Sequence, residues 1–183
     1  MWKKLETRSY TVTAAFTLAL ALSGTACSGK HDAVTVQNEE ETAPKLTSVV
    51  RMSDTKADSQ LLSGFYGVEN GWRWTAGKFT VLLKTPLGAA QKGATLTLDF
   101  TIPDVIIQKL KTVTLSTSIN GMMLKSESYK QGGKYTYTAD VPASMLTGDS
   151  VKVDFMTDKS LPPGDAERRE LAVIATSVGI ASK

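Results

Sequence analysis

The chain has 183 residues and is nearly balanced in charge, with 21 Lys and Arg against 18 Asp and Glu. It holds one cysteine and one histidine, which excludes an intramolecular disulfide and the usual histidine- or cysteine-based nucleophilic and zinc sites. The sequence has no basic stripe, glycine-rich phosphate loop or dinucleotide fingerprint, so we expect no nucleic-acid partner, no metal and no cofactor.

Residues 1–26 have the layout of an export signal peptide. A positively charged start is followed by an apolar run from Ala14 to Leu22, and small residues then lead to Cys27. The apolar run is about half the roughly 20 residues that a membrane-spanning helix needs. We therefore expect a signal that is cleaved, rather than a permanent transmembrane anchor.

Cys27 stands at the expected cleavage point. The stretch Ser-Gly-Thr-Ala-Cys at 23–27 resembles the lipobox of bacterial lipoproteins, although Gly24 occupies a position where leucine is usual. The resemblance implies that Cys27 carries lipid, with acyl chains such as palmitate in the bilayer, and Ser28 after it implies an outer-membrane lipoprotein of the cell envelope. The alternative is ordinary cleavage after Ala26, which leaves an unmodified thiol.

Residues 27–59 are predicted to form a disordered tether. They are polar, contain no aromatic residue and include the acidic run at 39–41 as well as His31. Such a segment buries too little apolar surface to offset the entropy of ordering the chain. One compact domain is therefore predicted over residues 60–183.

Period-two alternation predicts that this domain is all-β. The pattern indicates strands over 78–84, 94–101, 112–119, 134–141, 150–157 and 170–180, with a return strand beginning at Met122. Asn120-Gly121 is a strong hairpin signal because both residues accept positive φ. The segment 170–180 is apolar on both faces and suits a covered central strand. A short helical turn is expected at 142–148, and 103–109 is either a helical turn or a strand.

Seven or eight short strands with a Ser- and Thr-rich outer face predict two packed antiparallel sheets. The fold class is thus an antiparallel β-sandwich, for which a jelly-roll-like topology is preferred. The sequence leaves the order of the strands open.

The densest cluster of chemistry-bearing side chains is the segment 65–75. Trp72 and Trp74 lie two residues apart on a predicted strand and so share one face. Exposed tryptophans stack on sugar rings while Glu69, Asn70 and Arg73 hydrogen-bond hydroxyl groups, which would make a carbohydrate site. The competing interpretation is that both rings pack in the core, and that Arg73 points the other way and pairs with Glu69 or Glu170.

Three motifs carry a family resemblance: Glu69-x-x-x-Arg73-Trp74-Thr75, the Asn120-Gly121 hairpin, and Arg168-Arg169-Glu170-Leu171-Ala172-Val173. Together they resemble a β-sandwich module that accompanies bacterial glycosyltransferases and other polysaccharide-biosynthesis proteins. The chain departs from the module at Ala172, where glycine is usual. The resemblance implies an association with carbohydrate, and Arg169 and Glu170 are candidates for a structural ion pair.

The expectation for function is a membrane-anchored, non-catalytic lipoprotein that binds glycan or envelope polysaccharide. The alternative is a structural or protein-interaction lipoprotein of an envelope assembly. A small hydrolase built on a carboxylate pair, with Asp99 and Asp154 as examples, is the least favoured reading and requires their strands to be neighbours. Exposure of Trp72 and Trp74 separates the first two hypotheses.

Overall fold

The computed structural model describes residues 45–183. The predicted signal peptide, Cys27, His31 and most of the predicted tether lie outside the described residues. Within them lie nine strands: β1 Val49–Arg51, β2 Leu61–Phe65, β3 Arg73–Lys84, β4 Ala94–Ile102, β5 Val113–Ile119, β6 Met122–Tyr129, β7 Gly133–Val141, β8 Ser150–Thr157 and β9 Ile174–Ser182. The short helical elements are η1 Thr55–Gln60, α1 Ala89–Lys92, α2 Asp104–Leu110 and η2 Ala143–Met145.

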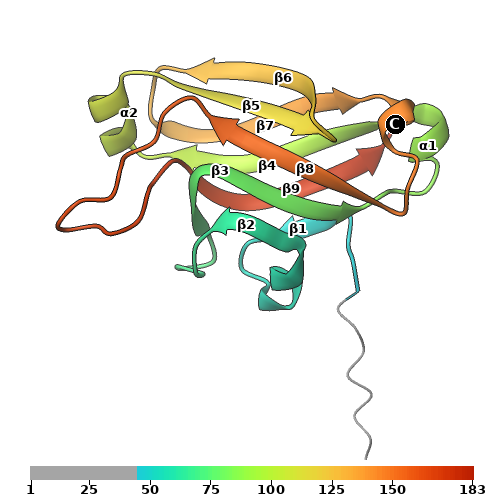
Figure 1. Cartoon of the computed structure of the whole chain (residues 1–183), viewed down its shortest axis with the longest axis horizontal. Coiled ribbons are helices and arrows are strands. Elements are labelled where there is room, and N and C mark those ends of the chain that lie inside the picture. The colour runs from blue at the N-terminus through green and yellow to red at the C-terminus, as the bar shows by residue number, and fades with distance from the viewer. Residues whose placement is uncertain (1–44) are drawn as a thin grey trace, which may run out of the picture. The chain divides into compact units, whose positions relative to one another are not determined.

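The strands form two layers that face each other (Figure 1). One sheet has the order β2-β3-β8-β5-β6, and we call it the five-stranded sheet. The other has the order β1-β9-β4-β7 and is called the four-stranded sheet. All pairings are antiparallel, and most successive strands from β3 to β9 change sheets, as in a jelly roll. The predicted all-β antiparallel sandwich is confirmed.

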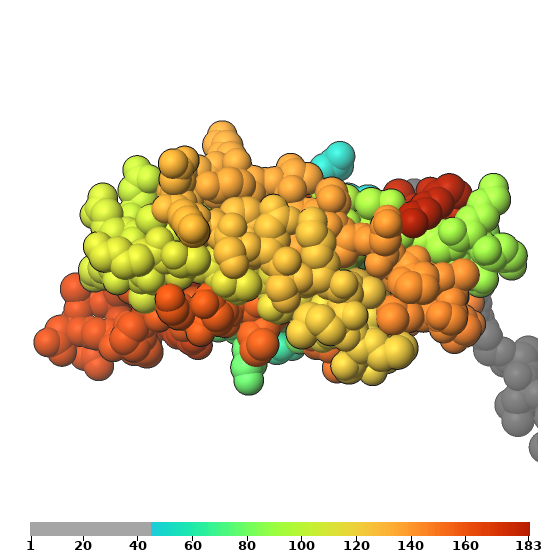
Figure 2. All heavy atoms as spheres, turned by 90° about the horizontal axis from the view of Figure 1, so that it is seen from above, coloured from blue at the N-terminus to red at the C-terminus, as the bar shows by residue number. Residues whose placement is uncertain are grey.

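Strand β3 joins the two sheets. Its first residues, Arg73 and Trp74, pair with β9, and its later part, Lys78 to Lys84, pairs with β8. The opposite margins of the sheets approach along β6 and β7 (Figure 2), where the Tyr137 hydroxyl donates a hydrogen bond to the Lys125 carbonyl at 2.9 Å. The sandwich is therefore connected through a shared strand on one side and through side chains on the other.

The core lies between the sheets and follows the predicted alternation. In β4, for example, Leu96, Leu98 and Phe100 are buried, while Thr97 and Asp99 between them are half-buried on the outer face. The segment 170–180 departs from its prediction. Its strand begins only at Ile174, and one face of β9 is partly exposed, because no further layer within residues 45–183 covers the four-stranded sheet.

Local signals at the turns were good predictors. Asn120 and Gly121 both have positive φ, at 50° and 78°, and connect β5 to β6 as predicted. The undecided segment 103–109 forms most of helix α2, which ends at Leu110, and the expected turn at 142–148 contains η2. No helix of residues 45–183 is long and apolar enough to cross a bilayer.

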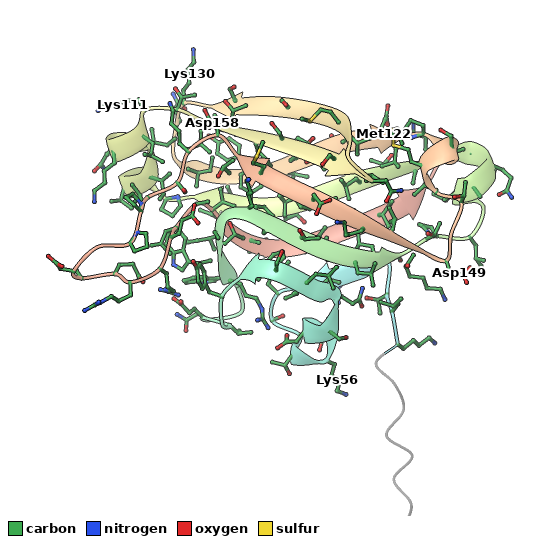
Figure 3. The ribbon with its side chains drawn as sticks, viewed as in Figure 1. Lys56, Lys111, Met122, Lys130, Asp149 and Asp158 are labelled. Atoms are coloured by element: carbon green, nitrogen blue, oxygen red, sulfur yellow. The ribbon has the colours of Figure 1, made fainter. Side chains whose placement is uncertain are left out.

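The folded unit begins before Gln60, which corrects the predicted end of the tether. Val50 and Met52 are fully buried, and β1 pairs with β9. Helix η1, marked by Lys56 in Figure 3, then leads into β2. Sequence patterning missed this segment because a three-residue strand without aromatic residues acquires its partner only in the assembled sandwich.

Candidate functional site

A tight hairpin presents most of the residues that the sequence singled out. Asn70 and Gly71 form its turn with φ of 49° and 88°, and Glu69 and Trp72 exchange two backbone hydrogen bonds of 2.8 and 3.1 Å. Positive φ at both central positions is the geometry that Asn-Gly favours. Asn70 is exposed at the tip of the hairpin, and its positive φ accounts for its presence in the turn.

Trp74 lies on the outer side of β3, Trp72 directly precedes this strand, and both side chains are half-buried. Their rings meet edge to face, with centroids 6.4 Å apart and an interplanar angle of 83°. Neither belongs to the fully buried core, although Trp74 packs against its margin. The shared face is as predicted, and the position of the rings lies between the two interpretations, because part of each side chain is buried and part reaches solvent.

Arg73 points to the other side of the strand and is only 6% exposed. Its guanidinium donates to the carbonyl oxygens of Met52 at 3.0 Å and Tyr66 at 3.2 Å and pairs with Asp58 at 2.6 Å. The predicted pairing with a glutamate is therefore wrong: the carboxylate partner is Asp58, which lies within the predicted tether. These contacts occupy the guanidinium and remove Arg73 from the candidate ligand contacts.

Arg169 organises the surface beside this hairpin. It pairs with Glu69 at 2.5 Å and with Glu167 at 2.9 Å, and its guanidinium lies 5.3 Å from the Tyr66 ring centre. Hydrogen bonds from the Arg169 side chain and backbone lower the pKa of Glu167 to about 2. Glu170, the other ion-pair candidate, instead accepts a hydrogen bond from Ser160. We call the cluster of Tyr66, Glu69, Trp72, Trp74 and Arg169 the aromatic corner.

A second candidate site lies on the outer face of the five-stranded sheet, where a hollow of about 410 Å³ opens to solvent. Strand pairing aligns its side chains in rows, because Thr80 and Ser118 both lie opposite Asp154 on β8, and Lys78 and Ser116 both lie opposite Met156. We call this hollow the sheet groove. Its outward side chains are Ser63, Lys78, Thr80, Ser116, Ser118, Met123, Asp154 and Met156.

The sheet groove combines hydrogen-bonding groups with apolar walls. The Thr80 hydroxyl donates to Asp154 at 2.8 Å, and the ammonium of Lys152 lies 3.5 Å from the same carboxylate. Met123 is 59% exposed and Met156 is 42% exposed, so thioether side chains line the hollow. This arrangement suits a ligand with several hydroxyl groups and short apolar faces.

The groove contains one carboxylate, that of Asp154. A small hydrolase would need a pair of carboxylates, and Asp99 and Asp154 do not form one. Asp154 lies on β8 in the five-stranded sheet, whereas Asp99 lies on β4, which pairs with β7 and β9. Their strands are not neighbours. Among residues 45–183, no group of three or more His, Cys, Asp or Glu is placed to hold a metal ion.

Sequence reasoning missed the sheet groove. Alternation indicated that Ser116, Ser118 and Thr80 point outward, but not that β3, β8 and β5 are neighbours. The one available signal was the presence of methionines at outward or turn positions, since Met122 and Met123 follow the hairpin turn directly (Figure 3).

No protein-family model and no curated protein sequence matches the chain. Among solved structures, it is similar to the carbohydrate-binding module TmCBM27, studied for specific mannan recognition (13% identity, TM-score 0.44, 76% of this chain and 98% of that one). It is also similar to the CBM36-1 domain of a multidomain xylanase from the hindgut metagenome of Trinervitermes trinervoides (10% identity, TM-score 0.43, 74% and 96%). A third is dimeric latent PorU from Porphyromonas gingivalis, at 12% identity and a TM-score of 0.40. That match covers 58% of this chain and 10% of the PorU chain. The domain thus has structural similarity to carbohydrate-binding-module sandwiches.

Proposed function

We propose that the described domain is a non-catalytic module that binds glycan chains, and that Cys27 anchors it by lipid to a bacterial envelope membrane. The observation that carries the binding proposal is the sheet groove. Its volume of about 410 Å³ falls within the range typical of ligand sites. Hydroxyl groups, an ammonium and a carboxylate converge in it, and exposed thioethers supply apolar contact.

The shape of the groove fits an extended ligand. Ser63, Thr80, Asp154, Ser118 and Met123 form one row across five neighbouring strands. With neighbouring strands roughly 4.8 Å apart, this row is about 19 Å long, the length of a short oligosaccharide. Each hydroxyl can both donate and accept a hydrogen bond, which suits the hydroxyl groups of sugars.

The aromatic corner is proposed as a second contact region for a longer chain. Trp74 lies on the same outward side of β3 as Lys78 and Thr80. The exposed parts of Trp72 and Trp74 supply stacking surface, because aromatic rings pack well on the C–H faces of sugars. Glu69 and Asn70 at the hairpin supply polar groups. Glu69 is shared with the ion pair to Arg169, so its contribution is weaker than that of an uncommitted carboxylate.

The binding proposal is tested on a glycan array with the full chain and two groove-filling variants, Ser116→Trp and Ser118→Trp. Both should abolish binding because an indole occupies the hollow. Thr97→Trp, on the outward face of β4 in the four-stranded sheet, is the matched control and should bind like the parent. Trp74→Ala should weaken binding of long chains more than of short ones. Binding that survives both groove variants would refute the assignment.

The anchor is proposed from the lipobox resemblance at 23–27 alone. Mass spectrometry of the mature N-terminus should find Cys27 acylated, and fractionation should place the protein in the outer membrane. Cys27→Ser should release it from the membrane, and an unmodified Cys27 in the parent would remove the proposal.

The alternative is a protein-interaction lipoprotein, and one observation favours it. Met122, Met123 and Met156 are 49%, 59% and 42% exposed, and exposed methionines are typical of adaptable binding surfaces. If no glycan on the array binds, while Met123→Ser disrupts co-purification with a defined envelope partner, this alternative replaces glycan binding.

A further inference from the structure

The sheet groove contains one paired and one unpaired charged side chain within the described residues. Asp154 already accepts a hydrogen bond from Thr80 and lies 3.5 Å from the Lys152 ammonium. Lys78 lines the same groove and is exposed, yet it takes part in no salt bridge within residues 45–183. The groove therefore presents one positive charge without a partner in the described part of the chain.

The side chains next to Lys78 explain why it has no carboxylate partner among the described residues. Directly across from it on β8 is Met156, an uncharged side chain, and the carboxylate of Asp154 lies one row further along. On the other side, β2 contributes Ser63 to the groove. A neutral ligand that covered this position would take an ammonium out of water without compensation, which is unfavourable. A ligand with a negative charge here would compensate it.

We infer that the glycan bound in the sheet groove is acidic, and that Lys78 pairs with an anionic substituent on it. This inference rests on the proposed function and names the class of its ligand. The substituent is a carboxylate, as in a uronic acid, or a sulfate. Both offer oxygen acceptors to the ammonium, whose three donors suit either group.

The test uses the full chain and matched polymers. Polygalacturonate and its fully methyl-esterified form have the same backbone and differ in charge, while heparin supplies sulfate. We expect tighter binding to a charged polymer than to the ester, and weakening as NaCl is raised from 50 to 500 mM, because salt screens ion pairs. Lys78→Gln should weaken that binding about three- to tenfold, Lys78→Arg should retain most of it, and Lys84→Gln, outward on β3 but outside the groove, should leave it unchanged.

The outcomes separate this inference from the function on which it rests. If a neutral glycan binds and Ser118→Trp abolishes that binding, while no charged polymer binds more tightly, the inference is overturned and glycan binding stands. If charged polymers bind but Lys78→Gln is without effect, the assignment to Lys78 is overturned. If no glycan of either kind binds, the proposed function fails, and this inference fails with it.

Discussion

The amide of Gln60 is expected to be a main source of stability at the edge where the chain enters the domain. It is 2% exposed and makes four hydrogen bonds. Its oxygen accepts from the Thr47 backbone and hydroxyl, both at 3.0 Å, and its nitrogen donates to the carbonyls of Thr47 at 2.9 Å and Leu82 at 2.7 Å. All the bonding capacity of the amide is used, and it joins the first described residues to β3.

Gln60→Leu keeps the approximate size of the side chain and removes all four bonds. Each buried hydrogen bond contributes about 0.5–1.5 kcal/mol net, and the added apolar burial recovers part of the loss. We expect the free energy of unfolding to fall by about 2–4 kcal/mol, a large share of the roughly 5–15 kcal/mol of a typical domain. Urea unfolding at pH 7 measures this, with Gln91→Leu, at an exposed position of α1, as the control.

Gln60→Glu adds a dependence on pH that a merely steric effect would lack. The introduced carboxyl places an oxygen against the Thr47 and Leu82 carbonyls in a buried site, which raises its pKa in the folded state above the unfolded value. The folded state then binds more protons, so the variant loses stability as pH rises above the unfolded pKa. It should be less stable at pH 7 than at pH 4, relative to Gln91→Glu. A loss below about 0.5 kcal/mol for Gln60→Leu, or no pH trend for Gln60→Glu, would refute the reasoning.

Three further predictions concern β2, the aromatic corner and the buried guanidinium. Gly64→Ala should disrupt β2 and lower stability by more than about 3 kcal/mol, because its Cβ would lie 2.0 Å from a backbone oxygen of β3, at φ of +75°. Gly67→Ala, with open space around it, should be near neutral in the same unfolding assay. Arg169→Gln should raise the pKa of Glu167 from about 2 toward its ordinary value, followed by carboxyl NMR, and an unchanged pKa would contradict the pairing. The pairing stabilises the fold above the unfolded pKa and is lost as pH falls through about 2. Arg73→Met should cost about 2–3 kcal/mol in thermal unfolding, and a loss under 1 kcal/mol would show that its contacts add little.

The fold was predictable where its determinants are local. Alternation in the segments of β4 and β5 decides which side chains face the core, and Asn120-Gly121 decides where the chain reverses. Strand β1 was not predictable in this way. Its three residues carry little pattern, and their burial depends on β9, near the other end of the chain.

The candidate site was likewise predictable only in the features that depend on residues close in the sequence. That Trp72 and Trp74 share a face follows from their spacing, and this was predicted correctly. The burial of Arg73 was missed because its partners, the Asp58 carboxylate and the Met52 carbonyl, lie in a segment before β2 that was not predicted to be folded. The sheet groove was missed because it exists only through the neighbouring positions of β3, β8 and β5, which no short sequence pattern determines.

Strand β3 connects the proposed binding face to the point where the chain enters the domain. On its outward side it carries Thr80, Lys78 and Trp74, and on its inward side Arg73 holds the segment after β1. Gln60 ties that segment to β3 a second time. Gln60 and Arg73 are both buried, and both hold a short segment with few contacts of its own against β3. Loss of either side chain should therefore loosen β1 and η1 before it disturbs the longer strands, because those strands keep their own ladders of backbone hydrogen bonds.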